Sequence, residues 1–219
     1  MAALFYRLSP RLVLCSREDP YAAGPGEQVL LLASGQAFPL GHPSTRLSLE
    51  LLRDALVARP VKRLLDLGCG TGVLGLAAMA LGVPRVVGAD ISLAAVQVTR
   101  ENARTHHLTD SLEVVQGSGA SLQGPFDLVA ANLPYEVQVD QAPELDRLAG
   151  PRGRLLLAGF REHQEDFLLE FYRQRGRSLV RRLEKPFHHP ELPGDLSFTW
   201  VAWLLAEKGR TPERVKQDF

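Results

Sequence analysis

A glycine-rich loop with an acid on either side is the first candidate for chemistry in this chain. The loop is Gly68-Cys69-Gly70-Thr71-Gly72, with Asp66 before it and Asp90 further on. Glycines at alternate positions let the backbone approach a bulky ligand closely, and the predicted helix behind them offers free N–H groups to the ligand's polar end. An acid at the end of the next strand, as predicted for Asp90, reaches the ribose hydroxyls of a nucleoside. The pattern predicts a nucleoside-binding loop.

Asp66 distinguishes between two classes of nucleoside cofactor. The stretch Gly70–Gly75 also matches the glycine fingerprint of dinucleotide-binding proteins, which is weak evidence by itself. A negative charge at Asp66 would repel a pyrophosphate and attract the ammonium of a methionine moiety. The DxGxGxG spacing therefore resembles the signature of the class I S-adenosylmethionine-dependent methyltransferases. A glycine corner without a cofactor, a cofactor-binding module without catalysis and a nicotinamide-dependent oxidoreductase remain alternatives.

That resemblance implies a cofactor, S-adenosyl-L-methionine, and a product, S-adenosyl-L-homocysteine. The cofactor-binding residues expected from this part of the chain are Asp66, Gly68, Cys69, Gly70, Thr71, Gly72, Asp90 and Ile91.

The tetrapeptide Asn132-Leu133-Pro134-Tyr135 directly follows a predicted strand and is the candidate catalytic motif. It resembles the NPPY-type motif of amino-group methyltransferases, in particular the version found in the rRNA adenine dimethyltransferases. In those families the Asn side-chain oxygen and the next backbone carbonyl accept hydrogen bonds from a planar amino group, and the aromatic residue stacks on the ring that carries it. The resemblance also implies that Asn132 lies beside the cofactor. The alternative is a turn, since Asn and Pro favour turns.

A second resemblance covers roughly residues 35–170. Gly35–Thr45 is similar to the FGTGxHxTT segment of the ribosomal-protein lysine methyltransferases, and Gly159–Glu165 is also similar to that family. It implies that His42 and Thr45 lie near the methionine end of the cofactor. From the residues alone, Ser44 or Thr45 is an N-cap candidate. The family carries Asn-Ile-Leu in place of Asn-Leu-Pro-Tyr and has an extra N-terminal substrate domain for which we expect no room here.

The adenine end of the predicted cofactor site lacks an acid. Many members of the methyltransferase superfamily carry one after the third strand, where this chain has Gln116-Gly117-Ser118-Gly119. Backbone groups or Ser118 would have to receive the adenine amino group, so Ser118 joins the expected cofactor-binding residues.

The reaction expected is transfer of a methyl group to a nitrogen of a macromolecular acceptor. That acceptor is either an amino group of an RNA base or a Gln or Lys side chain of a translation-related protein. A basic stretch from Arg173 to Lys185, with His188 and His189 beyond it, predicts a contact with RNA phosphates. Its alternative is a solvated helix end and an outer strand face. The six histidines and two cysteines show no metal-ligand spacing, so no metal site is expected.

These residues need a parallel sheet to position them. Nearly continuous apolar runs predict strands that are covered on both faces, and they alternate with helical stretches. The fold expected is α/β, a Rossmann-like, doubly wound, mostly parallel seven-stranded sheet with a C-terminal antiparallel hairpin. Core strands are predicted at 63–67, 85–90, 112–116, 126–131 and 154–159, hairpin strands at 178–185 and 197–207, and helices at 44–58, 73–81, 92–106, 141–149 and 162–176.

Length and composition agree with one globular enzyme domain. The 219 residues are 45% hydrophobic and 23% charged, which excludes disordered and fibrous classes, and 25 basic residues balance 25 acidic ones. We expect a strand-rich lead-in at 1–40, the methyltransferase domain at 41–207 and a charged tail at 208–219. The longest apolar stretch is too short for a bilayer, and two cysteines cannot build a disulfide framework, so a cytoplasmic location without membrane contact is expected.

Overall fold

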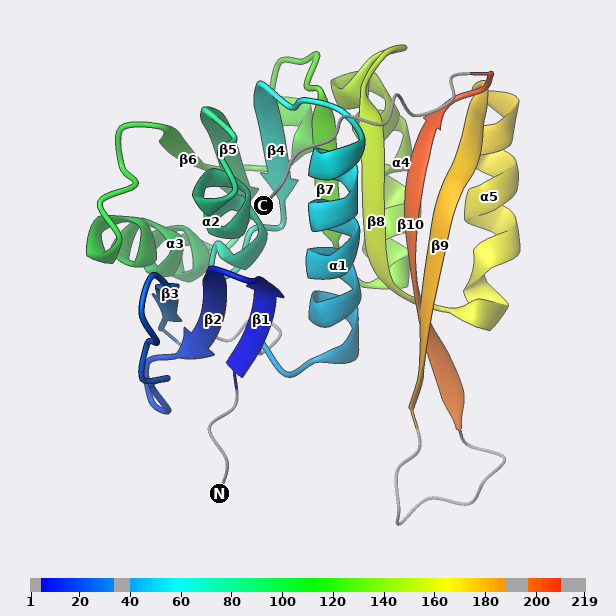
Figure 1. Ribbon diagram of the computed structural model, residues 1–219. Helices are drawn as coiled ribbons and strands as arrows, with labels where there is room; N and C mark the ends of the chain where they lie inside the picture. The colour runs from blue at the N-terminus through cyan, green and yellow to red at the C-terminus, as the bar shows by residue number, and fades with distance from the viewer. Residues whose placement is uncertain (1–4, 34–39, 188–196, 210–219) are drawn as a thin grey trace.

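The central sheet has seven strands in the order β6-β5-β4-β7-β8-β10-β9 (Figure 1). The computed structural model describes residues 5–33, 40–187 and 197–209. Five neighbouring strands are parallel, and β10 runs antiparallel to both β8 and β9, so the predicted sheet and its C-terminal hairpin are confirmed. The strands are β4 (Arg63–Leu67), β5 (Arg85–Asp90), β6 (Leu112–Gln116), β7 (Leu128–Asn132), β8 (Arg154–Arg161), β9 (Arg177–Phe187) and β10 (Phe198–Glu207).

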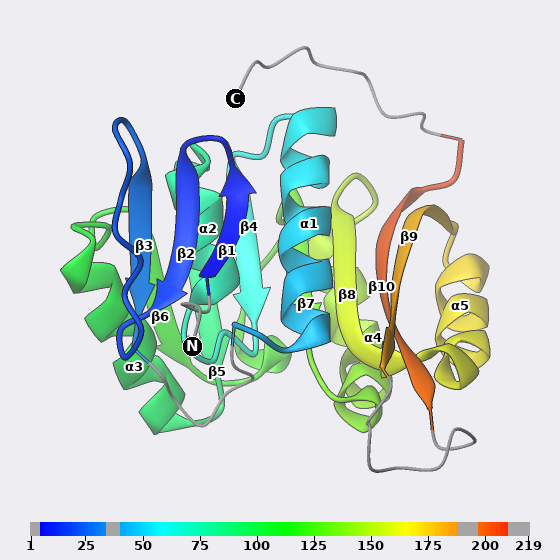
Figure 2. The same cartoon turned by 60° about the horizontal axis from the view of Figure 1, so that its bottom comes forward.

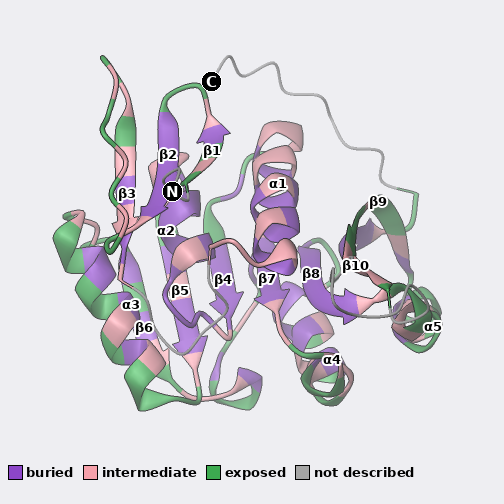
Figure 3. Cartoon of the chain, turned by 90° about the horizontal axis from the view of Figure 1, so that it is seen from below, coloured by how far each residue is buried: buried purple, intermediate pink, exposed green. Residues whose placement is uncertain are grey.

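Helices cover both faces of this sheet. Neighbouring residues of one strand point to opposite faces, so Leu64 joins a core under α1, α2 and α3, while Leu65 joins a second core under α4 and α5. Burial on both faces explains why the central strands β7 and β8 are almost wholly apolar, whereas the edge strand β9 is mostly exposed and rich in charged residues (Figure 3). None of the described helices is long and apolar enough to span a membrane. The helices are α1 (Pro43–Ala58), α2 (Val73–Ala80), α3 (Leu93–Thr105), α4 (Tyr135–Ala149) and α5 (Glu165–Gln174).

Three helix starts differ from the sequence prediction. Helix α4 begins at Tyr135 rather than at residue 141, because a buried Gln138 interrupts the apolar pattern of its first turns. Helix α5 begins at Glu165, after a short 3₁₀ turn at Glu162–Gln164. The predicted N-cap of α1 at Ser44 or Thr45 is wrong, since the imidazole of His42 accepts the hydrogen bond of the Ser44 amide.

The lead-in forms a small sheet of its own from β1 (Phe5–Ser9), β2 (Leu12–Ser16) and β3 (Gln28–Leu32). Figure 2 shows it as a separate layer on the α2 side of the molecule, where β3 contacts α2 and α3 and β1 contacts α1. Its leucines belong to the same core as α1 and α2. Asn102 of α3 links this layer to the glycine loop, accepting a hydrogen bond from Ala33 N at 2.9 Å and donating one to Thr71 O at 2.9 Å.

Candidate active site

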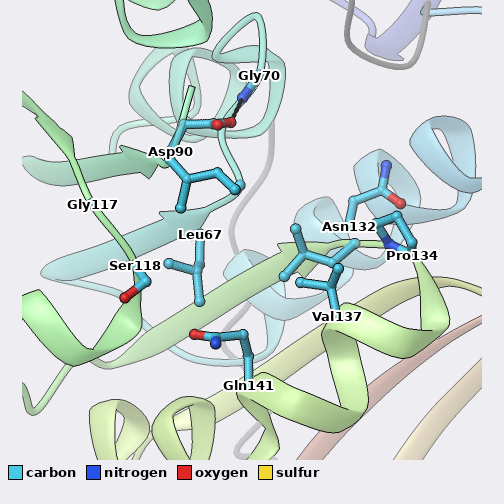
Figure 4. Close-up of a pocket in the computed structure, with 12 residues that line it drawn as sticks. Leu67, Gly70, Asp90, Gly117, Ser118, Asn132, Pro134, Val137 and Gln141 are labelled. Carbon is cyan, nitrogen blue, oxygen red and sulfur yellow. Dashed lines mark hydrogen bonds between the residues drawn. The ribbon is translucent and has the colours of Figure 1, made fainter. Parts of the chain in front are cut away.

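A pocket of about 390 Å³ opens at the carboxyl ends of the parallel strands (Figure 4). It lies where the strand order reverses between β4 and β7, which is where open α/β sheets bind their ligands. Four strand ends and the first turns of α4 supply its wall. The lining residues are Leu67, Gly68, Gly70, Asp90, Ile91, Gly117, Ser118, Asn132, Leu133, Pro134, Val137 and Gln141.

Asp90 holds the glycine loop in place. Its Oδ2 accepts a hydrogen bond from Gly70 N at 3.0 Å, and its Oδ1 accepts one from Ser92 N at 2.9 Å. Ser92 in turn caps α3, as the sequence predicted. Each carboxylate oxygen has a second lone pair. Asp90 can therefore receive ribose hydroxyls while it keeps the loop fixed.

Asp66 lies beneath the loop and is almost completely buried, with 2% of its surface exposed. Its Oδ2 accepts a hydrogen bond from Gly75 N at 2.9 Å. Burial raises the pKa of this carboxyl to about 7, against the stabilising effect of the Gly75 bond and with a further rise from nearby Asp90. At neutral pH Asp66 is therefore close to its midpoint of ionisation, and a cation placed beside it would favour the ionised form.

A small cavity of about 30 Å³ adjoins the large pocket and brings Asp66, Thr45 and Asn132 together. Thr45 Oγ1 and Asn132 Oδ1 are both buried, and neither has a hydrogen-bond partner in the described parts of the chain. Buried polar atoms without a partner are rare and point to a ligand or an ordered water. An ammonium group carries three donors. The Asp66 carboxyl with the unsatisfied Thr45 oxygen beside it therefore fits the ammonium of S-adenosyl-L-methionine, while Asn132 lines both cavities and lies at the border between them.

The Asn132-Leu133 segment is held tightly between two glycines. A Cβ at Gly68 would lie 2.2 Å from Leu133 Cδ2, and a Cβ at Gly159 would lie 2.2 Å from Leu133 O. Both glycines have positive φ, +74° and +100°. Gln138 of α4 adds a brace, because its Nε2 donates to Ala131 O at 2.8 Å and to Ala158 O at 2.9 Å. These contacts fix the backbone on both sides of Asn132.

The other predicted site residues are not all brought to the pocket. Ile91 and Ser118 line it, Ile91 with 76% of its surface exposed. Cys69 and Thr71 line only the small cavity, and burial raises the pKa of the Cys69 thiol to about 12. Two other predicted residues line neither cavity: Gly72 caps α2 with a φ of +80°, and Tyr135 packs half-buried against the core under α4.

Four lining residues were not predicted: Leu67, Gly117, Val137 and Gln141. Strand alternation could have found Leu67, because Asp66 and Leu67 must point to opposite faces of β4. Val137 and Gln141 face the pocket only because α4 starts at Tyr135. When the helix is predicted to begin at residue 141, nothing in the sequence indicates that these two side chains face the pocket.

The upstream segment is only partly described. Residues 35–39 lie outside the described residues, and His42 packs edge-on against the Trp200 ring at 4.8 Å. Burial lowers the pKa of His42.

The basic stretch is not a continuous positive surface. Arg177 is buried and donates to Asp146 at 2.8 Å, while Arg182 pairs with Glu165 at 2.8 Å. Arg173 and Arg181 have acidic neighbours as well, and His188 and His189 lie outside the described residues. Within residues 5–33, 40–187 and 197–209, no group of three or more His, Cys, Asp or Glu side chains is placed to hold a metal ion.

Comparison with known proteins gives the same family from sequence and a similar fold from structure. Residues 6–185 match the family model described as ribosomal protein L11 methyltransferase (PrmA). Proteins named ribosomal protein L11 methyltransferase from Geotalea uraniireducens and Geobacter sulfurreducens are each 38% identical, over 191 and 175 residues. The matches cover 80% of this chain and 59% and 57% of those relatives, so the chain spans less than two thirds of their length.

A solved structure of ribosomal protein L11 methylase from Lactobacillus delbrueckii subsp. bulgaricus has a similar fold. Its TM-score is 0.77 at 23% identity, covering 93% of this chain and 98% of that one. The family match extends from β1 into β9 and includes the glycine loop, Asp90 and the Asn132 segment. The chain belongs to the ribosomal protein L11 methyltransferase family.

Proposed function

We propose that this chain transfers a methyl group from S-adenosyl-L-methionine to a nitrogen atom of a protein. The observation that carries the proposal is the pocket at the β4–β7 switch point, with Asp90 on one side and the unsatisfied Asn132 oxygen on the other. Membership of the family supports a protein acceptor. The curated relatives are named for the methylation of ribosomal protein L11, and a translation-related protein is the acceptor class we propose here.

The proposal gives each pocket residue a separate role. Asp90 receives the ribose hydroxyls, and Asp66 with Thr45 receives the ammonium of the methionine moiety. Asn132 Oδ1 and the Leu133 carbonyl orient the acceptor nitrogen. Pro134 has no N–H, so it adds no donor that would compete with that nitrogen for these oxygens. The proposed roles of Cys69, Thr71 and Gly72 are confined to the backbone shape of the loop.

Catalysis in this proposal rests on position and electrostatics. The cofactor supplies an electrophilic sulfonium methyl group and leaves as the neutral thioether S-adenosyl-L-homocysteine. The acceptor nitrogen gains positive charge as it forms its bond to carbon, and it then releases a proton to solvent. Two oxygen acceptors aimed at that nitrogen stabilise the developing charge and hold its lone pair in line.

An amino group of an RNA base is a second candidate acceptor. It is favoured by Asn132-Leu133-Pro134-Tyr135, which resembles the motif for planar amino groups. Contact of RNA with Arg173–Lys185 stays a prediction, as does stacking of Tyr135 on the acceptor. A cofactor-binding module without catalysis is the remaining alternative. A cytoplasmic location also stays a prediction.

Transfer of a tritiated methyl group into fractionated cell extract tests the proposal. Protein and RNA pools are counted separately, with wild-type protein and with Asn132→Ala. We expect label in the protein pool with the wild type alone. Label in the RNA pool would favour the second candidate, and cofactor binding without label in either pool would favour the module without catalysis.

A further inference from the structure

The base-binding end of the large pocket has one polar side chain that the sequence did not indicate. In the proposed function Asp90 receives the ribose, Asp66 and Thr45 receive the methionine end, and Asn132 orients the acceptor. Among the described lining residues, Ser118 and Gln141 are the polar side chains left for the other end of the pocket. Figure 4 shows Gln141 rising from α4 into the pocket toward Leu67 and Ser118. The walls beside it, Leu67 and Val137, are apolar.

The amide of Gln141 has an unsatisfied carbonyl. Its Oε1 is buried without a hydrogen-bond partner in the described parts of the chain. The oxygen lies over Gly119, where an added Cβ would come within 3.1 Å of it. A carbonyl left without a donor beside a pocket costs free energy until a ligand supplies that donor.

Adenine is the ligand group whose edge matches an amide. It presents an amino donor next to a ring-nitrogen acceptor, and a glutamine amide can accept from the first and donate to the second in one plane. The end of β6 offers no carboxylate for the amino group, because residues 116–119 are Gln-Gly-Ser-Gly. The terminal torsion of glutamine is soft, so the amide can turn its oxygen toward the ligand at little cost.

We propose that Gln141 of α4 recognises the adenine edge of the cofactor in place of the acid missing after β6. The inference rests on the proposed function, since it needs a nucleoside in this pocket. It places base recognition on α4, the helix that begins at Tyr135, the last residue of the Asn132-Leu133-Pro134-Tyr135 motif. The base is then bound by the element that directly follows the acceptor motif.

The test compares two ligands on each variant by titration calorimetry. One ligand is S-adenosyl-L-homocysteine, and the other is its analogue with hydrogen in place of the 6-amino group. The variants are Gln141→Leu, which removes the amide, and Gln141→Glu, which keeps an acceptor. Ser118→Ala is the matched control, because Ser118 is the other polar side chain at that end. A ratio of two affinities on one variant is insensitive to partial misfolding.

We expect the wild type to prefer the 6-amino ligand about tenfold, the effect of one hydrogen bond made in a buried site. Gln141→Leu is expected to abolish the preference, and Gln141→Glu and Ser118→Ala are expected to keep it. An undiminished preference in Gln141→Leu, or its loss in Ser118→Ala, would overturn the assignment of Gln141. Failure of the wild type to bind S-adenosyl-L-homocysteine at all would instead overturn the proposed function, and this assignment with it.

Discussion

A buried carboxyl under the glycine loop makes the free protein sensitive to pH. The pKa of Asp66 lies at about 7 in the folded chain and at its ordinary 3.8 in an exposed setting. Between these values the unfolded chain has lost the proton and the folded chain has kept it. Because the folded state then binds more protons, stability falls as the pH rises from 4 to 7. The difference corresponds to at most about 4 kcal/mol.

Chemical denaturation at pH 4.5 and pH 7.5, with and without Asp66→Asn, measures this effect. The variant keeps an oxygen for Gly75 N and has no proton to lose, so its stability should change less across the range. S-Adenosyl-L-homocysteine should bind more tightly at pH 8 than at pH 6, because its ammonium favours the ionised acid. Equal pH slopes in the two proteins would show that Asp66 does not titrate as described.

Asn132 is the side chain on which catalysis depends most in the proposed function. Asn132→Ala removes the unsatisfied oxygen in the pocket and is expected to lower kcat by roughly 10²- to 10³-fold, as for the loss of one preorganised group in other enzymes. Affinity for S-adenosyl-L-homocysteine should change much less. Stopped methyl-transfer assays and calorimetry on the same preparation separate the two quantities. A proportionate loss of both would mean that Asn132 serves the cofactor alone.

Among the single residues of the site, the sequence predicted the polar ones better than the apolar ones. The types and spacing of Asp66, Asp90 and Asn132 are chemical signals, and all three lie at the two adjoining cavities. Val137 and Gln141 carry no such signal, because their position depends on where α4 begins. The ring of Tyr135 packs partly against the core at the start of α4, and its stacking on the acceptor stays a prediction.

At the scale of elements, the approach of β8 to the Asn132 segment depends on a glycine. Gly159→Ala would put a Cβ 2.2 Å from Leu133 O at a φ of +100°. We expect a loss of roughly 3 kcal/mol or more, from backbone strain together with the overlap. Thermal or urea unfolding measures it, and the displacement of Asn132 should also reduce methyl transfer.

Gly176→Ala is the matched control for that substitution. Gly176 also has a positive φ, +76°, but its added Cβ would meet no atom within 4 Å. It should therefore lose only the strain of the left-handed conformation, about 1–2 kcal/mol. Equal losses in the two variants would mean that contact with Leu133 contributes nothing.

Element order was predictable from the sequence because strands covered on both faces are apolar runs, and α/β alternation leaves few topologies. The boundaries of the elements were less predictable, because they depend on the contacts of single residues. Gln138 is buried in α4 to bond with Ala131 O and Ala158 O, and a buried polar residue breaks the helical pattern used to find its first turn. His42 caps α1 although Ser and Thr are commoner caps, because the two candidates lie inside the helix and are buried.

At the scale of the whole molecule, the lead-in sheet and the large sheet share one core. Leu30 of β3 and Leu204 of β10 belong to the same buried cluster. We therefore expect Leu30→Ala to lower the stability of the entire molecule by about 2–4 kcal/mol in one cooperative transition. Both tryptophans, Trp200 and Trp203, lie on β10, so their fluorescence reports on a distant part of the fold.

Urea unfolding followed by fluorescence and by circular dichroism checks this expectation. The two midpoints should shift together in Leu30→Ala and stay in place in Leu93→Ala, a substitution of a leucine that is 51% exposed. A fluorescence midpoint that does not move in Leu30→Ala would show that the lead-in unfolds independently.

The central claim is that the pocket at the switch point binds an activated-methyl nucleoside rather than a dinucleotide. Titration calorimetry with S-adenosyl-L-homocysteine and with NAD, on the wild type and on Asp90→Ala, tests it most directly. We expect S-adenosyl-L-homocysteine to bind at one site and NAD to show no saturable binding. In Asp90→Ala the affinity for S-adenosyl-L-homocysteine should fall on the order of a hundredfold, because the ribose contacts and the support of the loop are lost. Tighter binding of NAD, or an affinity for S-adenosyl-L-homocysteine that survives Asp90→Ala unchanged, would contradict it.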